Sequence, residues 1–92
     1  MSGNVVQIDN TSKNDNWITN NSGQSVTVAC KEPYGSFAVH LKPGETKRIT
    51  YDVKANVYPM GQYTYDDLKY KLDKRENWEV LREDGTLILK KM

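Results

Sequence analysis

The stretch that decides the fold is SVTVACKEPYGSFAVHLKPGETKRITYDV, residues 25–53. It holds three segments in which apolar and polar residues alternate, at 25–31, 36–41 and 46–53, and this is the pattern of strands with one buried face. The turn signals PYG at 33–35 and PG at 43–44 separate the segments. The pattern predicts three strands joined as a meander, whose apolar side chains face the core: Val26, Val28, Cys30, Phe37, Val39, Leu41, Ile49, Tyr51 and Val53.

The C-terminal segment has the pattern of a β-hairpin. Apolar residues at 78–81 and 87–89 flank the dipeptide Asp84-Gly85, and both residues of an Asp-Gly turn can take positive φ. At the other end of the chain, 5–8 and 17–19 are expected to be short strands on either side of an Asn-rich loop, 9–16. Trp17 and Trp78 are expected to fill the two ends of the core.

Residues 56–73 allow more than one interpretation. Pro59 cannot donate a hydrogen bond to a sheet, so 56–61 is expected to lie at an edge or in a loop. Farther on, Leu68, Tyr70 and Leu72 alternate with polar residues, which favours a strand over 65–73. Because Leu68 and Leu72 are four residues apart, a short helix near 65–73 stays open as the alternative.

About eight short strands in one chain of this length predict an all-β fold. The 92 residues make a single domain, 1–92, and we expect a small antiparallel β-sandwich. A small barrel is the alternative. The sandwich is favoured because most of the strands alternate and would therefore have one face in water.

The charge balance excludes several classes of partner. The chain has 13 basic and 12 acidic residues, a net charge of +1, whereas binding to nucleic acid needs a basic surplus.

No apolar run approaches the roughly 18 residues of a membrane span. The residues at the N-terminus lack the pattern of a signal peptide, and the single Cys30 excludes an internal disulfide. The compartment is left open, with the cytoplasm favoured over a secreted mature form because the thiol is unpaired.

Catalytic and metal-binding constellations are not apparent. His40 is the only histidine and is expected on a strand surface, while Cys30 lies on an apolar face and is expected to be a buried structural thiol. The adjacent acidic pairs at 66–67 and 83–84 would point to opposite faces of a strand and form no dyad. We therefore expect no enzyme, no cofactor and no metal site. The oxygen-rich loop 9–16 leaves calcium binding as an open question.

Aromatic residues supply the one suggestive functional feature. Tyr58, Tyr63 and Tyr65 are candidate binding residues, because tyrosine is enriched at recognition surfaces and is common in small β proteins; Tyr70 shares the face of Leu68 and Leu72. The sequence thus predicts a non-catalytic interaction module that binds another protein through a sheet face or edge, as inhibitor, immunity and assembly proteins do. A lectin-like carbohydrate-binding module is the alternative, and an exposed edge strand would also allow a homodimer.

Overall fold

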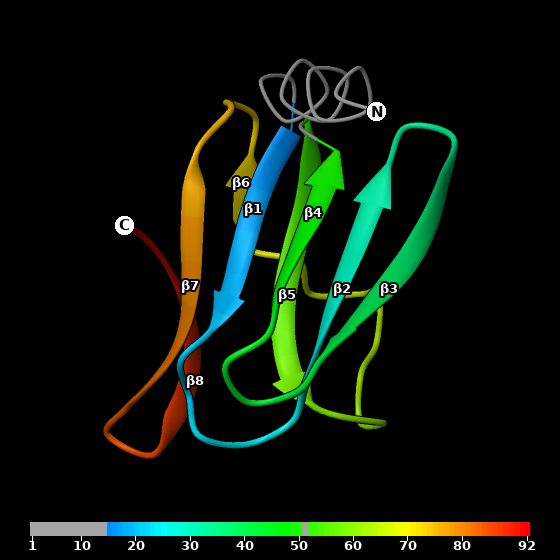
Figure 1. Ribbon diagram of the computed structural model, residues 1–92. Helices are drawn as coiled ribbons and strands as arrows, with labels where there is room; N and C mark the ends of the chain where they lie inside the picture. Colours follow the sequence, from blue (N-terminus) through cyan, green and yellow to red (C-terminus); the bar gives the residue numbers. More distant parts are fainter. Residues whose placement is uncertain (1–14, 51) are drawn as a thin grey trace, which may run out of the picture.

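The computed structural model of the protein describes residues 15–50 and 52–92. Its fold is a β-sandwich. Eight strands form two four-stranded sheets that pack against each other without closing into a barrel (Figure 1). The first sheet has the strand order β4-β1-β7-β8 and the second β3-β2-β5-β6. In chain order the strands are β1 (Asp15–Asn20), β2 (Val26–Glu32), β3 (Gly35–Leu41), β4 (Thr46–Thr50), β5 (Val53–Pro59), β6 (Tyr70–Leu72), β7 (Asn77–Glu83) and β8 (Thr86–Lys91). The predicted all-β sandwich is confirmed.

The core lies between the sheets and is built from the inward-facing residues of both. Cys30 is fully buried, as expected, and Trp78 is 5% exposed. Trp17 was expected to fill one end of the core, and this is wrong: its neighbours Asn16 and Ile18 are fully buried, whereas Trp17 is partly exposed and lies on the outer face of the first sheet. The core residues are Ile18, Val26, Val28, Cys30, Leu41, Ile49, Val53, Ala55, Val57, Leu72, Trp78, Val80 and Leu89.

Two-residue turns join the hairpins, as their turn residues predict. β7 and β8 pair from Glu83 opposite Thr86, and the turn residues Asp84 and Gly85 have φ of 51° and 77°. Positive φ at both positions is the signature of a type I′ turn, whose twist matches that of the flanking strands. β2 and β3 are also joined by a two-residue turn, formed by Pro33 and Tyr34, with Glu32 opposite Gly35.

The predicted three-strand meander is wrong, because β3 and β4 lie in different sheets. The segment expected as one strand, 46–53, ends at Thr50, and Val53 already belongs to the second sheet. Asp52, between them, has a φ of 66° and marks the change of direction. Ile49 and Val53 both face the core, so the alternation keeps its phase while the chain changes sheets, and the sequence pattern does not reveal the crossing.

One strand pair is parallel, which departs from the purely antiparallel arrangement expected. β1 pairs with β7 in parallel, with Ile18 opposite Trp78, and with β4 in antiparallel fashion. Parallel pairing needs a long connection between the strands. Here the connection passes through the whole second sheet.

The segment 56–73 agrees in part with the sequence interpretation. β5 runs to Pro59 and pairs with β2 up to that residue, whereas β6 pairs only with residues 53–55, so 56–59 lies at an edge of the sheet, as expected. Along β5, every second residue exchanges backbone hydrogen bonds with β2, and the residues between them face away from β2. Pro59 and Val57 are both of the second kind, so the missing N–H of Pro59 costs no bond to β2. The Val57 N–H donates to Asn56 Oδ1. The favoured strand over 65–73 is confirmed only for Tyr70–Leu72, and the alternative, a short helix, is absent from 65–73.

Three parts of the sequence expectation lie outside the described residues, and one of them is the core position of Tyr51. The expected strand 5–8 and most of the Asn-rich loop, 9–14, lie outside the described residues, so calcium binding is not tested. Within the described ranges no helix is long and apolar enough for a membrane crossing.

Two buried asparagines hold β1 in place. Asn16 Oδ1 accepts hydrogen bonds from the Glu76 N–H (3.0 Å) and from Trp78 Nε1 (3.3 Å). Asn20 makes a similar set of contacts at the other end of the strand. Both side chains are fully buried, and no buried side-chain polar atom of the described residues lacks a partner. The burial of the two amides is therefore fully compensated.

Candidate binding surface

The three candidate tyrosines share the outer face of the second sheet. Tyr58 lies in β5 opposite Thr27 of β2, in the row that continues to His40 of β3. Tyr63 and Tyr65 belong to the segment 60–69, which follows β5 and runs behind β2 in the view of Figure 1. The structure thus brings together residues that the sequence only placed in one stretch.

The segment 60–69 is fastened to the sheet at two points. The Gly61 N–H donates to Thr27 Oγ1 at 3.3 Å, and Asn56 Nδ2 donates to the Asp67 carbonyl oxygen at 2.9 Å. Thr27 and Ala29, whose side chains point to this outer face, are both fully buried. The central strand β2 is therefore covered on both faces, and the loop that covers it has a defined position.

Aromatic rings form an edge-to-face series on this face. The ring of Tyr63 lies 6.1 Å from that of His40, at an interplanar angle of 66°, and 5.6 Å from that of Tyr65, at 76°. Tyr63 is 38% exposed, while Tyr58 and Tyr65 are partly buried. Partial burial is the main cause that raises the pKa of Tyr65, and the neighbouring Tyr63 raises it further. We call Tyr58, Tyr63, Tyr65 and His40 the tyrosine cluster.

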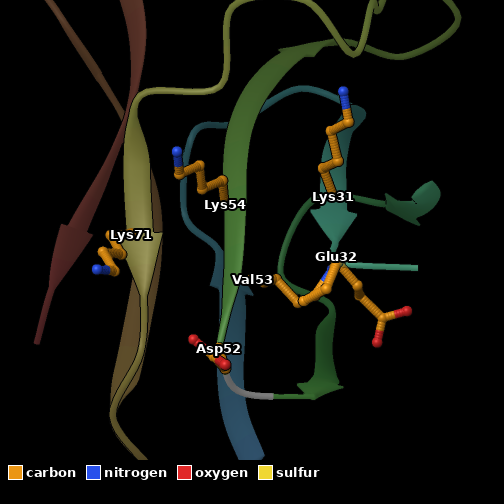
Figure 2. A pocket seen from close by; sticks show the side chains of 7 residues that line it. Lys31, Glu32, Asp52, Val53, Lys54 and Lys71 are labelled. Carbon is orange, nitrogen blue, oxygen red and sulfur yellow. The ribbon is translucent and has the colours of Figure 1, made fainter. Parts of the chain in front are cut away.

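A row of lysines lies on the same outer face. Lys31 of β2 is opposite Lys54 of β5, and Lys54 is opposite Lys71 of β6. With Glu32 and Asp52 they line a shallow hollow of ≈ 450 Å³, and Figure 2 shows the three lysine side chains extending from neighbouring strands. Like charges directly opposite one another destabilise a sheet, so the lysine row is costly unless something else compensates it.

Two side chains of the kind used in catalysis, His40 and Cys30, are engaged or buried in the structure. His40 Nδ1 is engaged with Thr27 Oγ1 at 2.8 Å. Burial, together with the nearby Glu32, raises the pKa of the Cys30 thiol to about 12, so the reactive thiolate is suppressed at neutral pH. Across residues 15–50 and 52–92, no group of three or more histidine, cysteine, aspartate and glutamate side chains could hold a metal ion.

Sequence reasoning missed two features of the surface. Tyr34 is fully exposed at the β2–β3 turn, and we had counted it only as a turn residue. The lysine row could not be anticipated, because it depends on the register of three strands. The exposure of Tyr34 could have been predicted from its place between Pro33 and Gly35, because a two-residue turn has no room to bury a side chain.

No family model matches this chain, and no curated protein or solved structure matches it significantly. Inferences about its function therefore rest on its own residues and their geometry.

Proposed function

We propose that the protein is a non-catalytic module that binds another protein through the outer face of the second sheet, with the tyrosine cluster at the centre of the contact. The observation that carries the proposal is the position of Tyr63, which is 38% exposed and packs edge-to-face on His40 and Tyr65. Exposed aromatic rings with supporting neighbours are common anchors of protein interfaces.

The attachment of the segment 60–69 supports the same function. Its bonds to Thr27 and Asn56 hold the tyrosine rings before any partner arrives. Binding then costs little conformational entropy, since the contact residues are already ordered.

The lysine row indicates the charge of the partner. Lys31, Lys54 and Lys71 stand side by side on the same face as the tyrosine cluster, and in the described part of the chain none of them forms a salt bridge. An acidic patch on the partner would relieve their mutual repulsion and guide association. Raising the salt concentration should accordingly slow the association of the two proteins.

Carbohydrate binding is the second candidate and would use the same exposed Tyr63. Sugar rings stack on open aromatic faces. Because Tyr63 and Tyr65 meet at 76°, they form no shared flat platform, and this favours the protein partner.

Affinity capture distinguishes the two candidates. The full chain is immobilised and exposed to lysate and culture medium of the source organism, and the retained proteins are identified by mass spectrometry; a glycan array is run in parallel. A stoichiometric protein with an acidic surface and a blank array are the expected results. Specific binding to glycans without a retained protein would replace the protein-binding proposal by the lectin-like one.

A further inference from the structure

β3 is an edge strand whose own residues carry none of the usual protection. It is seven residues long, has β2 as its only strand neighbour among residues 15–50 and 52–92, and lies at the outer right of the sheet in Figure 1. Its sequence, GSFAVHL, has no proline and no carboxylate, ammonium or guanidinium group. Natural edge strands are usually shortened or charged, because unpaired backbone groups invite another strand. The other edges follow that rule: β6 has three residues, and β4 and β8 each contain two basic residues.

The register shows which backbone groups are free. The two-residue turn makes Glu32 and Gly35 a hydrogen-bonded pair, and bonding to β2 then alternates along β3. The N–H and C=O groups of Ser36, Ala38 and His40 therefore point away from β2. The 2.7 Å contact from Lys47 Nζ to the His40 carbonyl oxygen agrees with this direction.

We propose that β3 pairs with β3 of a second copy of this chain, in antiparallel fashion about a two-fold axis at Ala38. In this register Ala38 bonds reciprocally to Ala38 of the second copy, and Ser36 bonds to His40 of the second copy. The three outward-facing residues of each strand are thus all used. The Lys47 contact gives way, and Lys47 keeps Glu45 at 3.8 Å as its ionic partner.

The side chains are compatible with this pairing on both faces. Phe37 and Val39, which are only partly buried against the core, stand opposite Val39 and Phe37 of the second copy and complete their burial. On the outer face Ala38 meets Ala38, and no charged pair is brought together. Tyr34, fully exposed in one chain, comes to lie opposite Lys42 of the second copy, where its ring can cover the lysine side chain.

The dimer would extend the second sheet to eight strands, twice the four of one chain. A two-fold axis perpendicular to a sheet keeps the outer faces of both copies on the same side. Two tyrosine clusters would then be presented to a single partner. A strand pairing of this length buries less than the roughly 1,200 Å² of a stable interface, so we expect a reversible dimer with a dissociation constant on the order of micromolar or weaker.

Sedimentation equilibrium on the full chain tests the association, and it requires no binding partner. The wild type should shift from monomer to dimer with concentration, whereas Ala38→Lys, which places like charges together at the axis, should weaken the dimer roughly tenfold or more. Its thermal stability should remain near that of the wild type, because the side chain points to the partly exposed outer face. A wild type that stays monomeric, or a dimer unaffected by Ala38→Lys, would overturn the proposal.

Cysteine cross-linking tests the register. Ala38→Cys should form a disulfide-linked dimer under mild oxidation, because its Cα would lie about 5.5 Å from that of its counterpart. Ser36→Cys is the matched control on the same edge, and its Cα would be roughly 14 Å from its counterpart, out of disulfide range. A mixture of Ser36→Cys and His40→Cys proteins should cross-link again. Equal cross-linking of the two single variants alone would indicate random collision and refute the register.

Discussion

Replacing Asn20 by alanine should destabilise the fold strongly, although the residue lies outside the hydrophobic core cluster. Asn20 Nδ2 donates to the carbonyl oxygens of Gln24 (2.6 Å) and Leu41 (3.1 Å). Its Oδ1 accepts from the Ser22 N–H (3.0 Å) and the Ser22 hydroxyl (2.7 Å). The single amide therefore connects β1 to the turn that follows it and to the end of β3.

The loss of unfolding free energy in Asn20→Ala depends on whether each former hydrogen-bond partner of Asn20 can bond to another group. Ser22 and Gln24 are partly exposed and can turn to water, and the Ser22 hydroxyl keeps the Gln24 carbonyl oxygen at 3.2 Å. The carbonyl oxygen of the fully buried Leu41 cannot turn to water, so after the substitution it keeps only its ladder bond to Val26 of β2. Losing two or three net hydrogen bonds, one of them to a buried acceptor, costs about 3 kcal/mol in the free energy of unfolding. For a domain of this size the midpoint of thermal unfolding should fall by roughly 10–25 °C.

Urea and thermal unfolding followed by circular dichroism measure this loss. Asn77→Ala is the control, because Asn77 is exposed and its loss should change stability by less than about 0.5 kcal/mol. Asn20→Asp should also be destabilised at neutral pH, where a carboxylate would face two carbonyl oxygens. Because burial raises the pKa of that carboxyl, its stability should recover as the pH falls. Wild-type stability for Asn20→Ala would refute the structural role assigned to this residue.

Three further predictions concern the core and the turns. Trp78→Ala should lower the unfolding free energy by about 3–5 kcal/mol, measured by urea titration, since Trp78 is 5% exposed; a loss below 1 kcal/mol would contradict its place in the core. Gly85→Ala should cost about 1 kcal/mol in the same titration, because Gly85 has a φ of 77°; Gly35→Ala, with no positive φ, is its control. The pKa of Cys30 rises from 9.0 to about 12, so wild-type stability should be complete below pH 9 and decline by on the order of 4 kcal/mol as the pH approaches 12. Cys30→Ala should lack that part of the decline, and identical pH profiles for the two proteins would contradict it.

Local chemistry allowed the hairpins to be predicted. Asp84-Gly85 and Pro33-Tyr34 join strands that are adjacent in the chain, and the residues of a short turn largely determine its geometry. The apolar positions of β2, β3 and β7 likewise identified six of the thirteen core residues.

The assignment of strands to sheets could not be predicted. Ile49 and Val53 face the core from different sheets, and alternation records only the burial of a face, not the sheet to which it belongs. The parallel pairing of β1 with β7 depends on strands far apart in the chain. Asn16 and Asn20 were ordinary turn residues by composition, and only the tertiary structure shows that they are buried.

The candidate surface was anticipated in part. Tyr58, Tyr63 and Tyr65 were selected for their residue type and spacing, and they do lie on one face. Their neighbour His40 could not have been added, because it comes from a different strand. The same holds for Lys31, Lys54 and Lys71, which meet only through the register of the second sheet.

The measurement that tests the central proposal most directly is affinity capture with two tyrosine variants. Tyr63→Ala removes the exposed ring of the tyrosine cluster, and Tyr34→Ala removes an equally large, fully exposed ring at the β2–β3 turn. Both variants should keep nearly wild-type stability, because neither ring is buried. We expect the partner retained by the wild type to be lost with Tyr63→Ala and kept with Tyr34→Ala. Undiminished capture by Tyr63→Ala would contradict the proposal that the outer face of the second sheet is the binding surface.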